Sequence, residues 1–344
     1  MKTLAILLLN LCWLGANATS WRVNSNPQVN AHFVSINDAV AHYTVENGDT
    51  LYLENGSYFA ATNLSKSLTL IGPGYFLLEN DSTYANPLPA LIASISCTTG
   101  SAGSKIIGVQ VIGSVNLTYS TANNITIERS YLGGVSGGGY SSSGLTIRQC
   151  YVIGSIIGSS ILSSSIHNNI IIGSISLTAS DGNHNIYNNV IYLNSTGTTY
   201  ALAAKNSSVL NNIIIREPYS IDPGVNRAEY CIDFSSTSNS NSSFARNVMS
   251  QSANVIFPEN IWNSDKESNF VLVGSSDEKW MLKAGSPGLG YGSNGDDCGA
   301  FGGAVKYVLS GLPWLVPRIF EAEIPASGSG NMIPVHIKAK TQEE

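Results

Sequence analysis

The sequence predicts an all-β fold: a right-handed parallel β-helix (solenoid) with an N-terminal helix cap and a C-terminal β-hairpin cap. Three observations predict it. They are a period of about 20 residues, β-branched runs broken by Gly, Ser and Asn, and Asn-Asn pairs at one point of successive repeats. We expect residues 1–18 to be a signal peptide, residues 19–306 the β-helix, and residues 307–344 the capping hairpin and tail.

The repeat occupies residues 123–215. Each unit begins at an aliphatic residue, and successive starts lie 20, 19, 20 and 23 residues apart: Ile127, Ile147, Ile166, Ile186 and Val209. This period suits one turn of a solenoid of short strands and is too short for two helices. The aliphatic starts should stack in one interior column, and right-handed crossovers are the default for parallel strands.

The Asn-Asn pairs lie between two apolar runs. Asn tolerates left-handed backbone and can therefore turn the chain sharply. Asn169, Asn189 and Asn212 fall in register, and Asn247 continues the series. Stacked strands lie about 4.8 Å apart, so these amides should form a hydrogen-bonded ladder with a structural role. Cys150 holds the same position one repeat earlier and should face inward.

An N-terminal helix is expected after Ser35, which can cap it together with Asp38, and it should end before residue 47. Its buried face should hold Ile36, Ala39, Val40 and Tyr43. Strands followed by glycine turns are predicted over residues 49–53 and 68–71.

This region contains three motifs: Ser-Ile-x-x-Ala-Val at 35–40, Gly-Asp-Thr-Leu-Tyr-Leu-x-x-Gly-x-Tyr at 48–58, and Leu-Thr-Leu-Ile-Gly-x-Gly at 68–74. Together they resemble the opening of right-handed β-helix proteins of the pectin-lyase-like superfamily. The resemblance covers residues 33–310 and implies that the helix plugs the open end of the coil. Residues 280–288 and 297–303 are similar to the last turn and the following segment of secreted bacterial members. No single activity is implied, because the superfamily includes lyases, hydrolases, epimerases, adhesins and inert surface proteins.

The tail contains two apolar segments, residues 319–324 and 333–338, around a Gly-Ser stretch at 326–330. This pattern predicts a β-hairpin. We expect the hairpin to cover the C-terminal end of the coil.

Residues 1–18 show the pattern of a secretory signal, with Lys2, an apolar run over residues 4–14 and a small-x-small cleavage site at 16–18. No later run reaches 18 apolar residues, so no membrane span is expected. We therefore expect a secreted, periplasmic or outer-surface protein. A formal net charge of −6 without a basic patch argues against a nucleic-acid partner. The later cysteines lack C-x-x-C spacing, which leaves their pairing open and disfavours zinc.

A row of side chains is predicted on the outside of the first strand of each turn. Five residues hold this position, out of phase with the interior column: Glu128, Arg148, His167, Tyr187 and Leu210. They should form a solvent-facing stripe in which Glu128 and Arg148 make an ion pair. In a functional interpretation, the stripe forms a saccharide groove that Glu128 and Tyr187 help to line. Arg148 or His167 would then act as the general base that accepts a proton from the substrate. In a structural interpretation, the stripe is a mixed surface whose exposed pair contributes ~0–1 kcal/mol.

An insertion of about 15 residues after residue 216 lengthens the period and concentrates charge. Its catalytic candidates are Glu217, Asp222 and Asp233, and its substrate-binding candidates are Arg216, Arg227 and Glu229. Lyase chemistry requires acidic residues around Ca²⁺ and a base, and hydrolysis requires two or three carboxylates on one face. The central turns hold too few acidic residues for either. No other cofactor or metal is expected, because His167 and His184 on adjacent turns lack a carboxylate pair.

These patterns favour polysaccharide as the partner. The leading hypothesis is a secreted or cell-surface β-helix protein that engages polysaccharide along the face of the coil, with no catalysis demonstrable from the sequence. The alternatives are a polysaccharide lyase or glycoside hydrolase acting on uronate-containing glycans, and a structural or adhesive surface protein. Three clustered carboxylates would favour the enzyme. An exposed aromatic row including Tyr187, without such a cluster, would favour binding. The oligomeric state is left open.

Overall fold

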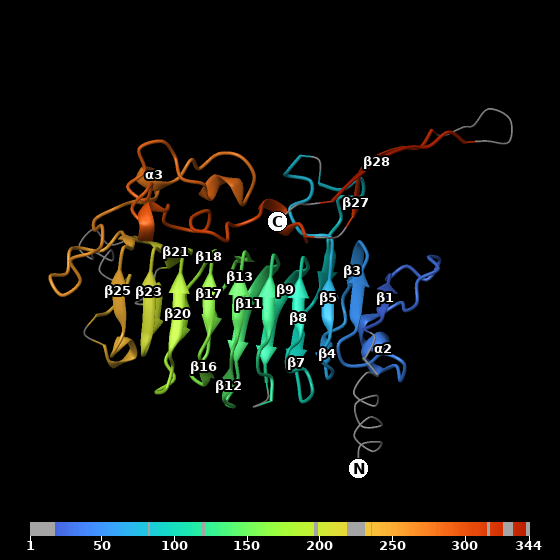
Figure 1. Ribbon diagram of the computed structural model, residues 1–344, viewed down its shortest axis with the longest axis horizontal. Coiled ribbons are helices and arrows are strands. Elements are labelled where there is room, and N and C mark those ends of the chain that lie inside the picture. Colours follow the sequence, from blue (N-terminus) through green and yellow to red (C-terminus); the bar gives the residue numbers. More distant parts are fainter. Residues whose placement is uncertain are drawn as a thin grey trace, which may run out of the picture.

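A computed structural model gives a right-handed parallel β-helix with an outer layer along one side (Figure 1). It describes residues 18–81, 83–118, 121–195, 199–218, 231–234, 236–314, 317–325 and 333–341. The leader expected at residues 1–18 lies almost wholly outside the described residues. Within them, no helix is long and apolar enough to cross a membrane.

Two parallel sheets run along the coil. Sheet A has ten strands: β1 (Ser20–Val23), β2 (Thr50–Leu53), β5 (Thr69–Ile71), β8 (Lys105–Ile107), β10 (Thr126–Glu128), β13 (Thr146–Arg148), β17 (Ser165–His167), β20 (His184–Tyr187), β23 (Ser207–Leu210) and β25 (Ser243–Ala245). Sheet B has fourteen: β3 (Gly56–Tyr58), β4 (Thr62–Leu64), β6 (Ala90–Ile92), β7 (Ile95–Cys97), β9 (Gln110–Leu117), β11 (Tyr131–Gly137), β14 (Tyr151–Val152), β15 (Ile156–Ile157), β18 (Ile170–Ile172), β19 (Ile175–Leu177), β21 (Val190–Ser195), β22 (Leu202–Ala204), β24 (Ile213–Pro218) and β26 (Val248–Met249). A short third pair joins β12 (Ser142–Ser143) and β16 (Ile161–Leu162).

The predicted interior column is confirmed. Ile127 pairs with Ile147, Ile147 with Ile166, and Ile166 with Ile186 across parallel strands of sheet A. Val209 continues the column, and all five side chains are buried. Since strands stack in register, like positions of successive turns form columns, and each outward position has a neighbour on the turn above.

The asparagine ladder is also confirmed. Asn169 Nδ2 donates to Asn189 Oδ1 at 2.9 Å, Asn189 to Asn212 at 2.9 Å, and Asn212 to Asn247 at 3.0 Å. The ladder continues to Asn260, and Cys150 lies buried at its other end. Every amide also donates to a backbone carbonyl, so the ladder satisfies buried polar groups along the corner after sheet A.

Sheet B bends at a column of glycines. A Cβ built on Gly133, Gly154 or Gly173 would overlap a backbone carbonyl oxygen of the preceding turn. The two strand segments of each turn therefore meet at a corner that excludes any side chain. The sequence carries this signal as Gly-Gly or Gly-Ser once per turn.

The N-terminal end is closed by α2 (Ile36–Ala41), as expected. The Ser35 hydroxyl accepts a hydrogen bond from the backbone N–H of Asp38 at 3.0 Å, and Ile36, Ala39 and Val40 join the interior core. Tyr43 does not. Its side chain is 85% exposed because the helix ends two residues before it.

The C-terminal end is closed by aromatic side chains and not by the hairpin. Phe234 contacts Phe244 of β25 and Phe257 at ring-centroid distances of 5.0 Å, and Trp262 at 5.9 Å. The segment expected to be the last turn lies in the outer layer instead. There Trp280 packs 5.1 Å from Tyr192 on the outside of sheet B.

The outer layer follows α3 (Lys266–Asn269) and returns along the coil toward its N-terminal part (Figure 1). We call residues 293–312 the strap. Side chains at the corner after sheet A bind its backbone in turn: Asn188 donates to Asp297 O, Asn168 to Ala300 O and Gly302 O, Gln149 to Lys306 O, and Arg129 to Leu312 O. Each of these four residues has a positive φ, between 49° and 55°. The first Asn of each pair thus turns the chain and holds the strap, while the second builds the ladder.

The predicted hairpin forms from β27 (Arg318–Glu323) and β28 (His336–Lys340), which are antiparallel. Its expected position is wrong. Ala85 N donates to Ile319 O at 2.9 Å, so the hairpin starts beside the early turns and projects away from the coil (Figure 1). The strap carries the chain back along the coil, which is why its last segment cannot cover the last turn.

Candidate functional site

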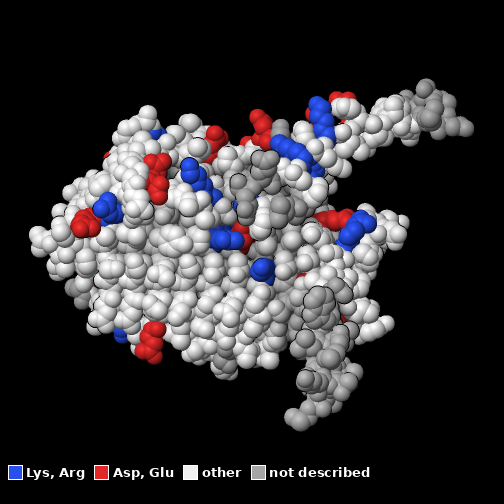
Figure 2. Space-filling model, viewed as in Figure 1, with Lys and Arg blue, Asp and Glu red and all other residues white. Residues whose placement is uncertain are grey.

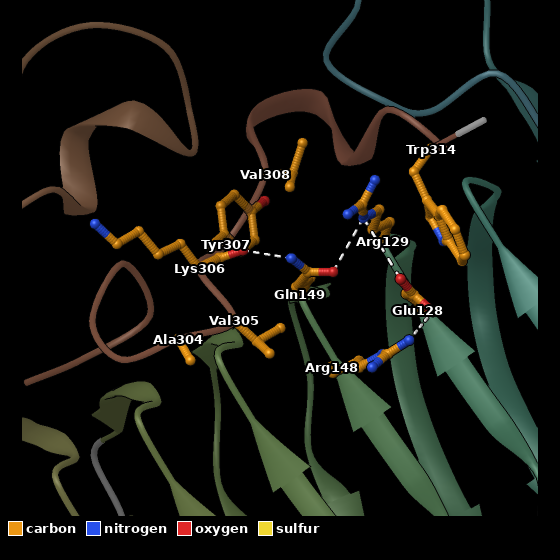
Figure 3. Close-up of a pocket in the computed structure, with 10 residues that line it drawn as sticks. All are labelled: Glu128, Arg129, Arg148, Gln149, Ala304, Val305, Lys306, Tyr307, Val308 and Trp314. Atoms are coloured by element: carbon orange, nitrogen blue, oxygen red, sulfur yellow. Dashed lines mark hydrogen bonds and ion pairs between the residues drawn. The ribbon is translucent and has the colours of Figure 1, made fainter. Parts of the chain in front are cut away.

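A cavity of about 600 Å³ lies between sheet A and the strap. Figure 3 shows its lining, which comes from the ends of β10 and β13 and from the strap and the residues after it. The lining residues are Glu128, Arg129, Arg148, Gln149, Ala304, Val305, Lys306, Tyr307, Val308 and Trp314. The charged side chains on this side of the molecule gather along the outer layer, and the coil below them is almost uncharged (Figure 2).

The floor of the cavity comes from two parallel strands in register. Glu128 pairs with Arg148 across β10 and β13, and Arg129 and Gln149 follow at the corner. The sequences Thr-Ile-Glu-Arg and Thr-Ile-Arg-Gln bury the Ile and direct the next side chain outward. Arg129 and Gln149 occupy the corner position that later turns give to Asn, and their longer side chains reach the strap.

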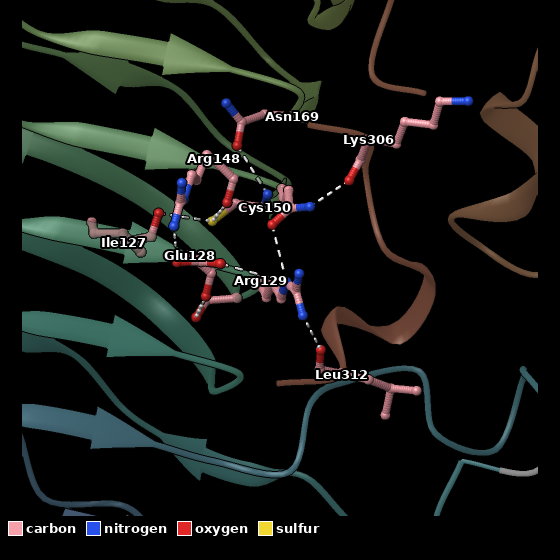
Figure 4. Close-up of polar contacts among 10 residues, drawn as sticks. Ile127, Glu128, Arg129, Arg148, Cys150, Asn169, Lys306 and Leu312 are labelled. Atoms are coloured by element: carbon pink, nitrogen blue, oxygen red, sulfur yellow. Dashed lines mark hydrogen bonds and ion pairs between the residues drawn. The ribbon is translucent and has the colours of Figure 1, made fainter. Parts of the chain in front are cut away.

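The predicted Glu128–Arg148 ion pair is confirmed, but it is not exposed. Arg148 Nη2 lies 2.8 Å from Glu128 Oε2, and Arg129 Nε lies 3.5 Å from Glu128 Oε1 (Figure 4). The Glu128 side chain is only 5% exposed, whereas that of Arg148 is 34% exposed. Removing one partner of a buried pair typically costs roughly 3–5 kcal/mol, since the other charge is left unpaired. The expectation that Glu128 is exposed in this pair is therefore wrong.

Arg148 retains hydrogen-bonding capacity. A guanidinium has five N–H donors in a planar fork. Among the described residues, the Arg148 Nε has no acceptor although it is buried, and Nη2 donates to Glu128. A ligand can therefore reach only the exposed part of this side chain, which is 34% exposed, and not the buried Nε.

The strap side of the cavity, which we call its roof, is held in place by a buried network of hydrogen bonds. The hydroxyls of Tyr307 and Tyr75 lie 2.6 Å apart, and Asp277 accepts hydrogen bonds from Ser310 N at 2.7 Å and Ser275 Oγ at 2.8 Å. Burial raises the pKa of both tyrosines well above the usual value, so both stay protonated. Beside this anchor, Val305 and Lys306 are exposed and Trp314 is half-buried, which leaves an apolar and a cationic group at the rim.

His167 and Tyr187 are neighbours on the stripe, as predicted, and their rings stack 4.6 Å apart at 4°. His167 is buried beneath the strap, so the predicted solvent-facing stripe is wrong at this position. Asn168 Nδ2 donates to the strap, which points Asn168 Oδ1 at His167 Nδ1, 3.0 Å away. Nδ1 is therefore the protonated nitrogen. Burial lowers the pKa of His167, and the ring is neutral at pH 7.

In the charged insertion, the candidates Glu217 and Arg216 are engaged by other groups of the protein, which differs from the substrate-facing roles expected of them. Glu217 forms an ion pair with Lys266 at 2.6 Å and accepts a hydrogen bond from the Tyr192 hydroxyl. The Arg216 side chain is buried and donates to the carbonyls of Thr199 and Ser195 at 3.0 and 3.3 Å. This burial argues against a surface role in contacting substrate.

Asp233 accepts a hydrogen bond from the Tyr200 hydroxyl at 3.1 Å. Asp222, Arg227 and Glu229 lie outside the described residues. Within the described part of the chain, no group of three His, Cys, Asp or Glu side chains could hold a metal ion. His167 and His184, considered as a pair, lie at opposite ends of their strands.

The sequence missed most of the roof. Lys306, Tyr307 and Trp314 lie in a segment without periodicity, and the strap is held through backbone carbonyls that carry no sequence signal. Arg129 and Gln149 were within reach of sequence analysis, because they replace Asn at the corner of two successive turns. The four described cysteines are buried and unpaired, and none contributes to the site.

Comparison with protein-family models finds none that matches the chain, and comparison with curated proteins finds no similar sequence.

Proposed function

We propose that the protein is a secreted or cell-surface β-helix protein of the pectin-lyase-like type that binds polysaccharide without cleaving it. One or a few sugar units would occupy the cavity between sheet A and the strap. The observation that carries the proposal is the pairing of an aromatic and aliphatic rim, Trp314 and Val305, with the guanidinium-bearing side chain of Arg148 on the floor, which remains 34% exposed.

This combination suits a sugar ring. A pyranose has C–H faces that pack on aromatic and aliphatic side chains and hydroxyls that need fixed hydrogen-bond partners. Trp314 supplies a flat apolar surface and an indole N–H, and Arg148 supplies donors held in place by Glu128. Because Glu128 already holds Arg148 at 2.8 Å, binding would order little of the Arg148 side chain.

The geometry supports binding over cleavage at this cavity. Of the ten residues that line it, only Glu128 is acidic, and its two oxygens already face Arg148 and Arg129. Glycoside hydrolysis normally uses two carboxylates about 5–9.5 Å apart. His167, proposed as a base, is buried, and its protonated nitrogen faces Asn168.

The enzymatic alternative is a lyase or hydrolase whose acidic residues come from the insertion after residue 216, with Ca²⁺ if a lyase. Three of its residues lie outside the described part, and Glu217 is paired with Lys266. The structural or adhesive alternative needs no cavity. Secretion remains part of the proposal and is supported by the leader pattern of residues 1–18.

The test is binding of the protein to a panel of neutral and uronate-containing glycans, measured by affinity electrophoresis and calorimetry. Unsaturated products and new reducing ends are followed with and without chelator. We expect at least one glycan to bind without product formation. Product that disappears with chelator would favour the lyase, and no binding to any glycan would overturn the proposal.

A matched pair of variants locates the site. Trp314→Ala should weaken binding at least about fivefold, because it removes the aromatic surface. Tyr43→Ala removes an exposed aromatic at the far end of the coil and should change affinity by less than about twofold. Equal effects of the two substitutions would exclude the strap cavity as the site.

A further inference from the structure

The C-terminal hairpin has two chemically different faces. In its register Glu321 lies opposite Lys338 and Glu323 opposite His336, which places these charged residues on one face. The alternating positions make up the other face, where Ile319 lies opposite Ala339 and Ala322 opposite Ile337. We call the second set the apolar face of the hairpin. We propose that the apolar face of the hairpin is a docking surface for the same face of a second copy of the chain.

The apolar face is exposed along its length. Ile337 is 52% exposed and Ile319 is 43% exposed, and all five residues of β28 are exposed. The charged face is internally paired, with Lys338 Nζ 2.8 Å from Glu321 and Lys340 Nζ 4.7 Å from the Phe320 ring centroid. A two-stranded ribbon that leaves its aliphatic side in water is marginal alone and gains stability when that side is covered.

The base of the hairpin is fixed while the rest projects. Arg318 is buried at the start of β27, and Ile319 O accepts a hydrogen bond from Ala85 N. The remainder of the ribbon extends beyond the body of the coil (Figure 1). The ribbon therefore presents its apolar face at a defined position, where a second molecule can approach without meeting the coil.

The chemistry of the face selects the partner. Aliphatic side chains without an aromatic or polar group do not suit a sugar, and the hairpin lacks the basic excess that a nucleic acid or acidic lipid surface requires. Arg318, Lys338 and Lys340 nearly balance Glu321 and Glu323, so two copies would meet without strong repulsion. A second hairpin offers an apolar strip of equal length, and a two-fold axis makes the contact self-complementary.

The contact is small. A five-residue strand spans roughly 17 Å, so two stacked ribbons bury well below the area of a standard stable interface. We therefore expect a dimer that dissociates on dilution and not an obligate one. This inference is independent of the proposed glycan binding.

Sedimentation equilibrium of the full chain tests the proposal. The wild type should show a reversible monomer–dimer equilibrium, and Ile337→Thr should raise the dissociation constant at least about tenfold, since Thr keeps the strand but removes apolar surface. The matched control Lys338→Thr changes the neighbouring residue on the opposite face and should alter the constant less than about threefold. A wild type that stays monomeric up to about 500 µM, or equal effects of the two variants, would overturn the proposal.

Cross-linking gives a second readout that does not depend on hairpin stability. The described native cysteines are buried, so a new surface cysteine in a Cys12→Ser background reacts selectively. With a short bismaleimide, Ala339→Cys on the apolar face should form covalent dimers, and Lys338→Cys on the charged face should form several-fold fewer. Dimers that form equally from both positions would contradict a face-to-face contact.

Discussion

The two corners that flank sheet A are built alike and used differently. At the corner after the strands, the non-glycine residues with left-handed backbone are Arg129, Gln149, Asn168, Asn188, Asn211 and Arg246. At the corner before the strands, the residues with left-handed backbone include Asn124, Gly144, Ser163, Asn183, Asn206 and Asn241. At both corners the next residue in the chain turns toward the interior.

These inward residues differ between the two corners. After the strands, Ser130 and Cys150 are the inward residues of two early turns, and the later turns all have Asn. These Asn side chains hydrogen-bond to one another from turn to turn. Before the strands, Ile125, Leu145, Ser164 and His184 each fill the corner in their own way. A ladder of identical amides requires the same residue in every turn. The other corner combines apolar packing with a Ser164–His184 hydrogen bond of 2.7 Å, and its sequence does not repeat. Only the first corner also holds the strap, so it determines both the stacking and the roof of the cavity.

Breaking the ladder should have the largest effect. Asn189→Ala removes donors to Asn212 Oδ1 and Ile166 O and an acceptor for Asn169. Several buried groups lose their partners, so we expect the free energy of unfolding to fall by about 3–5 kcal/mol. Chemical denaturation followed by circular dichroism measures it. A loss below about 1 kcal/mol would show that the ladder is dispensable.

The corner before the strands should respond to acid. Burial lowers the pKa of His184 to about 4, and an unfolded chain titrates near 6.5. Between these pH values the unfolded state binds a proton that the folded state does not. The free energy of unfolding therefore has its full value above about pH 6.5 and falls by up to about 3 kcal/mol as the pH approaches 4. The buried His167 shifts in the same direction. Melting temperatures between pH 7.5 and 4.5 measure this loss, and His184→Gln should flatten the profile. An unchanged profile in that variant would assign the acid sensitivity elsewhere.

The smallest effect should separate turning from strap binding. Asn188→Gly keeps the left-handed backbone and removes the hydrogen bond to Asp297 O, so the strap should lose about 1 kcal/mol of local stability. Asn183→Gly has the same backbone requirement at the corner away from the strap and should leave the strap unchanged. Hydrogen exchange of residues 297–303 distinguishes them, and equal exchange in both variants would show that this bond does not hold the strap.

The sequence predicted the parts of the fold that neighbouring turns determine. The column from Ile127 to Ile186, the ladder from Asn169 to Asn247 and the Ser35 cap follow from short-range periodicity and capping chemistry. The Gly133, Gly154 and Gly173 column was equally visible in the sequence, but its role requires knowing that carbonyl oxygens of adjacent turns meet there.

The candidate site could be predicted only in part, because its roof and floor are far apart in the chain. The register of Glu128, Arg148, His167 and Tyr187 was predicted correctly, yet the burial of Glu128 and His167 was not. That burial depends on the strap, which is held through backbone carbonyls and so leaves no residue pattern. The hairpin was placed at the wrong end for the same reason, since the path of the strap determines where the tail emerges.

The reversed path of the strap has a consequence for biosynthesis. Turns of the coil can stack one after another as the chain emerges, but Lys306 and Trp314 are made 158 and 166 residues after Arg148. Until they arrive, the Glu128 carboxylate remains hydrated and the cavity has no roof. We expect chains ending near residue 262 to stack their turns yet lack a ligand site. The molecule would then become able to bind ligand only when synthesis is complete, and not when the coil forms.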